Sequence, residues 1–152
     1  MGKIDDTDMK ILRELVNDAS LSVPKLSKKI NVNSSVVYSR IKRLIKRGFI
    51  KKFTVVVNEQ LLGYNVEAIV GANVDSKRRA SVMEALLGLE QVRSVHEVTG
   101  RFDLLVFVKT RNLDELHDLI SNKFAAIDGI THTETFVQMS SRTREPVYTI
   151  PK

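Results

Sequence analysis

The most informative stretch of this chain is SSVVYSRIKRLIKRG, which runs from Ser34 to Gly48. Its apolar residues recur at intervals of three and four, which is the spacing of an amphipathic α-helix. A glycine after the last periodic residue is a usual helix stop, because glycine adopts a positive φ without strain. The stretch therefore predicts a helix over residues 34–47. Its buried stripe is expected to consist of Val37, Ile41, Leu44 and Ile45.

Two shorter helices are predicted upstream of this stretch. Residues 5–17 carry apolar side chains at helical spacing, and three aspartates stand at the start, where carboxylates favour the helix dipole. Ser22 is a good N-cap, and Pro24 suits the first turn of a second helix. Asn31 tolerates the left-handed conformation of a tight turn, and Asn33 can cap the next helix. Two short helices, a tight turn and a longer helix make the order of a helix-turn-helix.

The positive charge of the chain is concentrated at one end. The whole chain carries a net charge of +6, but residues 1–52 hold 13 Lys and Arg against 5 Asp and Glu, a balance of +8. Five of these basic residues fall between Arg40 and Arg47. A one-ended basic patch is the footprint of a nucleic-acid-binding module, and a solvated charged helix is the plainer reading.

In a helix-turn-helix the third helix enters the major groove of double-stranded DNA with its N-terminal residues near the base edges. The residues expected to read bases or line the groove are Ser34, Ser35, Tyr38, Ser39 and Lys42. The other cations are expected mainly to contact phosphates, which position a protein without reading sequence. These are Arg40, Arg43, Lys46 and Arg47. A three-helix protein-interaction module is the alternative.

Beyond Gly48 the pattern changes to that of strands. Residues 49–57 are rich in β-branched and aromatic side chains and predict a connecting strand. Strands are then expected at 66–74, 92–98, 104–110 and 131–139, with helices at 77–87 and 113–127. This βαββαβ order is that of a ferredoxin-like sandwich. The predicted class is α+β, with a helix-turn-helix (winged-helix-like) domain at 1–49, a connecting strand and hinge at 50–65, and the βαββαβ domain at 66–152.

The βαββαβ part contains an internal repeat, since Leu89-Glu90-Gln91-Val92 and Ile127-Asp128-Gly129-Ile130 both follow an amphipathic helix and precede a strand. In this architecture both helices cover the same face of the sheet. The other face must be solvated or buried against a partner, and its apolar residues favour a homodimer joined through the sheets. The helices are expected to bury Val82, Met83, Leu86, Leu87, Leu113, Leu116, Ile120, Phe124 and Ile127.

Three segments together resemble the Lrp/AsnC (leucine-responsive, feast/famine) family of transcriptional regulators. They are Ile4–Leu12, Arg40–Ile50 and the Gly100-Arg101-Phe102-Asp103 turn. The resemblance covers nearly the whole chain and implies a DNA-binding regulator that wraps or bends DNA. It also implies dimers joined through the C-terminal sheets and assembled further into tetramers, octamers or larger rings. The chain departs from the family pattern at Asn31, where glycine is usual, and lacks a proline near Asn33.

The resemblance also implies a small effector, an amino acid or similar molecule, bound where dimers meet. The residues carried over to this chain are Gly100, Arg101, Phe102, Asp103, Thr133 and Thr135. Asp103 could pair with an α-ammonium group and Arg101 with a carboxylate, while both threonines point the same way from one strand. In the alternative reading Asp103 stabilises only its own turn.

The sequence offers no motif for catalysis, metal binding or a cofactor. There is no cysteine, and His96, His117 and His132 lack metal-ligand spacing, so no catalytic residue, metal or cofactor is expected. Two alternatives stay open: a general DNA organiser, and a tetrapyrrole decarboxylase of similar architecture that would use His96 with Arg93 or Arg101. No long apolar run or signal peptide is present, so the expected location is the cytoplasm, without a membrane partner.

Overall fold

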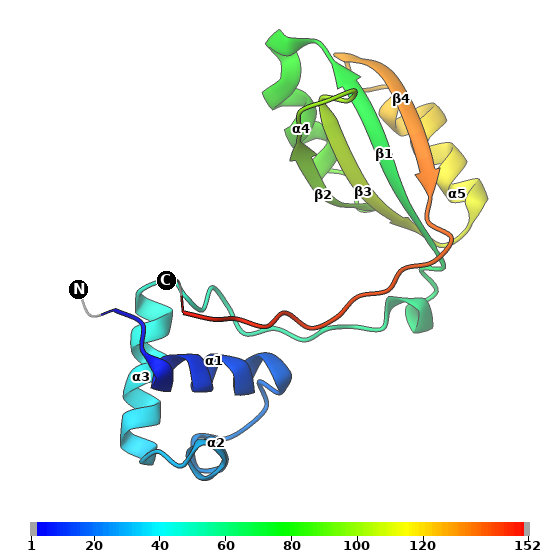
Figure 1. Cartoon of the computed structure of the whole chain (residues 1–152). Helices are drawn as coiled ribbons and strands as arrows, with labels where there is room; N and C mark the ends of the chain where they lie inside the picture. The colour runs from blue at the N-terminus through cyan, green and yellow to red at the C-terminus, as the bar shows by residue number, and fades with distance from the viewer. Residues whose placement is uncertain (1–2, 151–152) are drawn as a thin grey trace. The chain divides into compact units, whose positions relative to one another are not determined.

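The computed structural model describes residues 3–150 and divides the chain into two compact units (Figure 1). The first consists of the residues up to Val56 together with the segment from Thr143 onward, and the second is Val57–Arg142. The C-terminal segment is thus grouped with the N-terminal helices. Within residues 3–150 no helix is long and apolar enough to cross a membrane.

The N-terminal unit contains the three predicted helices, α1 (Asp6–Asn17), α2 (Val23–Ile30) and α3 (Ser34–Lys46). Their start signals act as predicted, because the Ser22 hydroxyl accepts from the backbone N–H of Lys25 and the Asn33 amide oxygen accepts from that of Ser35. The helices enclose a small apolar core. It is formed by Ile11, Leu15, Leu26, Val37 and Leu44, all of them buried.

The turn between α2 and α3 depends on Asn31, which has φ 55° and ψ 50°. It is the one non-glycine residue with positive φ in the described chain, and asparagine tolerates this left-handed conformation. The Ser27 hydroxyl donates to the carbonyl oxygen of Val32 and so ties α2 to the turn. Gly48, with φ 77°, ends the helical region after α3. The prediction of a tight turn made by asparagine in place of glycine is confirmed.

The buried stripe predicted for α3 included one residue too many. Ile45 is 45% exposed, whereas Val37 and Leu44 are fully buried. At 3.6 residues per turn Ile45 lies roughly 80° around the helix axis from Val37, at the edge of the stripe. Two short helices cover only the centre of that stripe. The prediction that Ile45 is buried is therefore wrong for the single chain.

The connecting strand predicted over residues 49–57 is not formed in the single chain. Residues 51–58 carry no regular secondary structure, and Val55 and Val56 are 78% and 100% exposed. The residues have strand character, but a strand also needs a neighbour to accept and donate its backbone hydrogen bonds. The amino-acid composition of residues 49–57 predicts a preference for extended backbone, but it does not predict whether a neighbouring strand is present.

The second unit has the predicted ferredoxin-like topology. Its helices are α4 (Arg79–Leu87), α5 (Leu113–Asp118), the short 3-10 turns η1 (Glu59–Leu62) and η2 (Ser76–Arg78), and the π-helical η3 (Leu119–Phe124). Its strands are β1 (Val66–Val74), β2 (Val92–Glu97), β3 (Leu104–Thr110) and β4 (Ile130–Val137). All neighbours are antiparallel in the order β2-β3-β1-β4.

The helices lie against one face of this sheet, as Figure 1 shows. Alternate residues of β1 and β3, such as Val70 and Val106, pack with Leu86 of α4 and Phe124 of η3 into one buried core. Leu87 and Leu113 were expected in this core but are 55% and 61% exposed. Each stands at an end of its helix, Leu87 as the last residue of α4 and Leu113 as the first of α5.

The face of the sheet away from the helices, called the open face below, carries large apolar side chains. Phe107 and Phe136 on it are 38% and 50% exposed. Phe102 lies across Gly71 of β1, where a Cβ atom would come within 2.5 Å of the Phe102 ring. Glycine is required there because the aromatic ring occupies the place of a side chain. Phe102 also packs edge-to-face on Phe136, with ring centroids 6.1 Å apart.

Candidate DNA-binding surface and effector loop

The outward side of α3 carries most of the residues predicted to contact DNA. Ser35, Tyr38, Ser39, Lys42 and Lys46 are exposed. Tyr38 is supported by the Lys42 ammonium group, which lies 4.8 Å from the centre of its ring. Since Asn33 caps the helix and leaves this first turn accessible, polar side chains and one aromatic ring are presented together at the N-terminal half of α3.

The other four predicted contacts are half-buried: Ser34, Arg40, Arg43 and Arg47. Arg47 stacks on the ring of Phe49, with 5.0 Å between the guanidinium carbon and the ring centre. Arg40 and Arg43 are drawn toward the start of α1. These two arginines therefore have partners inside the protein, which their positions on α3 did not predict.

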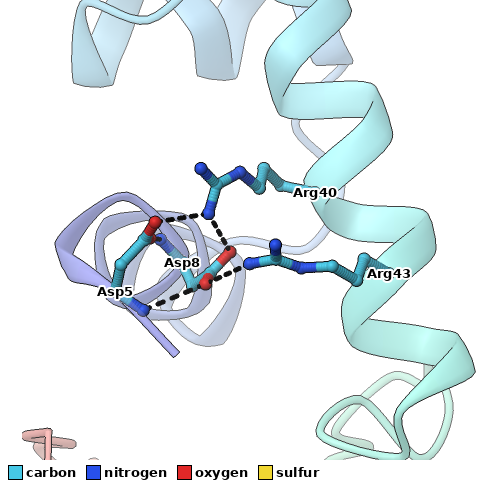
Figure 2. A network of polar contacts seen from close by, with 4 residues as sticks. All are labelled: Asp5, Asp8, Arg40 and Arg43. Carbon is cyan, nitrogen blue, oxygen red and sulfur yellow. Dashed lines mark hydrogen bonds and ion pairs between the residues drawn. The ribbon is translucent and has the colours of Figure 1, made fainter. Parts of the chain in front are cut away.

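Figure 2 shows the network that joins α3 to α1. Nη1 of Arg40 lies 2.5 Å from Oδ2 of Asp5 and 3.2 Å from Oδ1 of Asp8. Nη2 of Arg43 lies 2.6 Å from the other carboxylate oxygen of Asp8. The two aspartates also cap α1 reciprocally, because each accepts from the backbone N–H of the other. The carboxylates of Asp5 and Asp8 thus cap the N-terminus of α1 and also orient α3.

Burial differs sharply within this network. The Asp8 side chain is only 1% exposed, whereas that of Asp5 is 47% exposed. A buried carboxylate is tolerated when it is paired and hydrogen-bonded, and Asp8 meets both conditions. The pairing could have been suspected from spacing: the acids stand three residues apart at 5 and 8, and the arginines three apart at 40 and 43.

The charge state of Asp5 is also determined by this network. The backbone hydrogen bond from Asp8, and then the bond from Arg40, lower the pKa of Asp5 from its usual 3.8 to about 2. The bond to Asp5 raises the pKa of Arg40 in turn. Because the pKa of Asp5 is lower in the folded protein, its contribution to stability is complete above pH 3.8 and is lost as the pH falls toward about 2.

The predicted effector loop lies between β2 and β3, and Asp103 holds it together. Its Oδ2 accepts from the backbone N–H of Val74 at 2.9 Å, next to a register shift in the pairing of β1 with β4. Its carbonyl oxygen accepts from the N–H of Val98 at 3.0 Å, and its own N–H donates to Ala72. The Asp103 side chain therefore fastens the loop to the end of β1.

Arg79, at the start of α4, connects the two ends of the same loop. It contacts Glu97 at 2.5 Å and lies 3.8 Å from Oδ1 of Asp103. Gly100 has φ 109° at the tip of the loop, with no atom within 4 Å of the place of a Cβ. The loop is thus anchored at its base and open at its tip.

The other predicted effector residues lie on opposite faces of the sheet. Arg101 pairs with Glu134 at 2.5 Å, and Glu134 stands opposite Gly71 on the open face, where Phe102 also lies. Thr133 and Thr135 stand opposite Ala72 and Val70 and so point to the helix side. Thr133 there borders a shallow hollow of about 330 Å³ beside Phe124. One chain alone does not bring the loop and the threonines together.

The three histidines are separate from one another in the described chain. His96 contacts Ser94 at 3.0 Å and packs on Phe107, His117 lies 3.4 Å from Ser121, and His132 lies 3.6 Å from Glu134. Within residues 3–150 no three His, Asp or Glu side chains are grouped in a way that could hold a metal ion.

A basic helix-turn-helix joined to a ferredoxin-like domain defines a class of two-domain DNA-binding regulators, and comparison with known proteins agrees. Residues 4–51 match the winged helix-turn-helix DNA-binding model, and residues 67–148 match the Lrp/AsnC ligand binding domain model. The transcriptional regulator FL11 of Pyrococcus furiosus is 34% identical, over 95% of this chain and 96% of its own. The regulatory protein AsnC of Haemophilus influenzae is 31% identical, over 93% of this chain and 95% of its own. This chain belongs to the Lrp/AsnC family, as its sequence predicted.

Solved structures give the same result. The structure of AsnC from Escherichia coli superposes with a TM-score of 0.88 at 28% identity, over 95% of this chain and all of the other. A transcriptional regulator of Neisseria meningitidis, crystallised in complex with L-methionine, superposes with a TM-score of 0.91, over 97% of each chain. At 16% identity that second likeness shows the shared fold.

Replacing Asp8 by Asn is expected to destabilise the three-helix domain, because Arg40 and Arg43 lose their shared buried carboxylate. Breaking a fully buried pair costs about 3–5 kcal/mol, and the partly exposed arginines reduce the expected loss to about 2–3 kcal/mol. The measurement is urea unfolding followed by amide exchange in peptides of α1–α3. Lys29→Ala is the control, since it breaks only the surface pair with Glu14 and should cost less than about 1 kcal/mol. Equal effects of the two substitutions would contradict this role of Asp8.

Proposed function

We propose that this protein is a transcription regulator that binds double-stranded DNA by placing α3 in the major groove. The observation that carries the proposal is that α3 has two features at once. One face of the helix is polar and exposed, and another side of it is held to α1 by a buried ionic network. A recognition helix must be both accessible and fixed, because base contacts depend on a defined orientation. The family membership of the chain supports the same function.

Within this function the exposed and half-buried residues of α3 have different roles. Ser35, Tyr38 and Ser39, with Lys42 and the half-buried Ser34, face the bases or line the groove. Lys46 and Arg47 contact phosphates near the C-terminal end of the helix. Arg40 and Arg43 contact phosphates while Asp8 keeps its bonds to both arginines. No catalytic step is assigned, since the separate histidines present no acid–base pair.

Lys46→Ala is expected to weaken binding to all DNA sequences to a similar extent. Each phosphate contact contributes about 0.9 to the slope of log affinity against log salt, so the slope should fall by about one. The test is a titration against a site selected from a random duplex pool, and against a scrambled duplex, at several salt concentrations. Lys77→Ala in η2 is the charge-matched control and should leave the slope unchanged. If wild-type protein binds both duplexes equally, the protein is a general DNA organiser and the proposal fails.

We also propose that two copies of the chain associate through the open face of the sheet. Phe107 and Phe136 are too exposed there for an isolated domain, and Ile69 and Leu105 lie on the same face. A contiguous apolar surface of this kind marks a contact with a partner. A dimer would present two copies of α3, and half-sites about 34 Å apart would suit successive major grooves. The resemblance supports further assembly into tetramers or octamers.

Phe107→Glu is expected to convert the dimer to monomers, because the new carboxylate would be buried without a partner at the interface. Light scattering after size-exclusion chromatography measures the mass directly. Leu113→Glu, at an exposed apolar position on α5, is the matched control and should leave the mass unchanged. A wild-type protein that is monomeric at micromolar concentration would contradict the proposed dimer.

A small amino acid is the effector class that we propose for the C-terminal domain. Because Gly100–Asp103 and the two threonines lie on different faces of the sheet, a ligand that touches both sets must lie between two chains. Arg101 is 75% exposed and can leave Glu134 to bind a carboxylate. Thr133 and Thr135 supply hydroxyl groups from the second chain. Effector binding and assembly are therefore coupled in this proposal.

Screening the twenty common L-amino acids by thermal shift tests the proposed effector. One or a few should raise the melting temperature, since a ligand at 100 times its Kd stabilises by about 2.7 kcal/mol. Thr133→Val should reduce that shift, while Thr99→Val, next to Gly100 and outside the proposed contacts, should keep it. If no amino acid changes the melting temperature or the assembly, the proposed effector class is wrong.

A further inference from the structure

The last described residues of the chain return to its first helix. Arg13 on α1 donates to the carbonyl oxygen of Tyr148 from Nε at 3.3 Å and from Nη2 at 3.1 Å. Val147 is 80% exposed, but the neighbouring Tyr148 and Ile150 fall to 47% and 38%. The segment from Thr143 onward forms one compact unit with the N-terminal helices. Arg13 of α1 therefore holds the backbone of the C-terminal segment at Tyr148.

This contact gives the chain a second connection between its two compact units. The first connection is residues 51–58, which run from the helical domain to Glu59. Glu59 is anchored in the second unit by Lys109 and by Arg93, the latter at 3.0 Å. A single unstructured connection leaves domains free to reorient.

The second connection begins just after β4. The backbone N–H of Gln138 donates to the carbonyl oxygen of Glu67 at 2.8 Å, and its side-chain amide donates to the Glu67 carboxylate at 2.9 Å. The chain is then held again at Tyr148. Tyr148 follows Gln138 by ten residues, and a fully extended chain of that length spans at most about 36 Å. The segment between β4 and Tyr148 is therefore short.

We propose that residues 143–150 are a strap that fastens the C-terminal end of the ligand-binding domain to α1. The strap contacts α1, which is joined to α3 by the ionic network. It does not contact α3 through this hydrogen bond. It leaves the exposed residues of α3 accessible. Its effect is to restrict the orientation of the helix-turn-helix domain relative to the end of β4, the strand that carries Thr133 and Thr135.

The docking is tested by limited trypsin cleavage of the full-length protein, in the absence of DNA and amino acids. Trypsin can cut after Arg142, at the start of the strap, and after Arg144 within it. It can also cut after Lys51 and Lys52 in the exposed connection, and these two sites serve as an internal reference. Arg13→Gln should raise cleavage in the strap about three- to tenfold relative to that reference, because a charge-assisted hydrogen bond is lost. Lys10→Gln, an exposed change of the same charge on the same helix, should not. Equal cleavage in wild type and Arg13→Gln would overturn the strap.

A second measurement tests the restriction of orientation and rests on the proposed DNA binding. A tethered pair of reading helices gains affinity from a high effective concentration only when both can engage at once. Arg13→Gln, and a chain that ends at Arg142, should therefore lose about three- to tenfold in affinity for a duplex with two half-sites. Their affinity for a single half-site should match that of wild type.

The outcomes of the two measurements separate the two proposals. Equal losses on one and two half-sites would make Arg13 a DNA contact and overturn its role in the strap. If wild-type protein binds neither duplex, the proposed function fails, while the cleavage experiment still decides whether residues 143–150 dock on α1.

Discussion

The arrangement of the DNA-binding domain depends on one buried carboxylate, that of Asp8. Three short helices supply few core residues, and apolar contacts alone leave the direction of α3 weakly specified. Asp8 adds a directional constraint, because its two oxygens accept from arginines one turn apart on α3. The same side chain caps α1, so the start of the first helix and the orientation of the third are determined together. Ionic contacts of this kind provide geometry more than net stability.

The C-terminal domain solves a different problem, that of a sheet with helices on one side only. Its helix-covered face forms a core like that of any small globular domain, while the open face keeps exposed aromatic side chains. The small residue Gly71 lets Phe102 lie flat against this face and links the loop between β2 and β3 to the same surface. In the proposed dimer, a partner that covers the open face would also touch the base of the loop, so the proposed assembly and the proposed effector site would share residues.

Much of this structure follows from the sequence, and the failures have a common cause. Helix starts and the Asn31 turn depend on neighbours close in the chain, and the strands depend on period-two alternation, so one sequence is enough to predict them. The strand order follows from the βαββαβ order of the elements, which is that of a known motif. The exposure of Ile45 and the missing strand at 51–58 depend on what lies across from them, which the sequence does not state. The sequence of α3 does not distinguish an arginine that binds a phosphate from one that binds an aspartate. The contact of Tyr148 with Arg13 was not predicted either, because no hydrophobic periodicity marks residues 143–150.

The ionic network need not compete with DNA for Arg40. Its partner Asp8 is buried at the helix interface, but its other partner, Asp5, is 47% exposed. A phosphate oxygen can take the place of the Asp5 carboxylate at the guanidinium group while Asp8 keeps its own bonds to Arg40 and Arg43. Such an exchange replaces one charge-assisted hydrogen bond by another, so its cost is small. The place of Arg40 in the network is therefore compatible with the phosphate contact proposed for it.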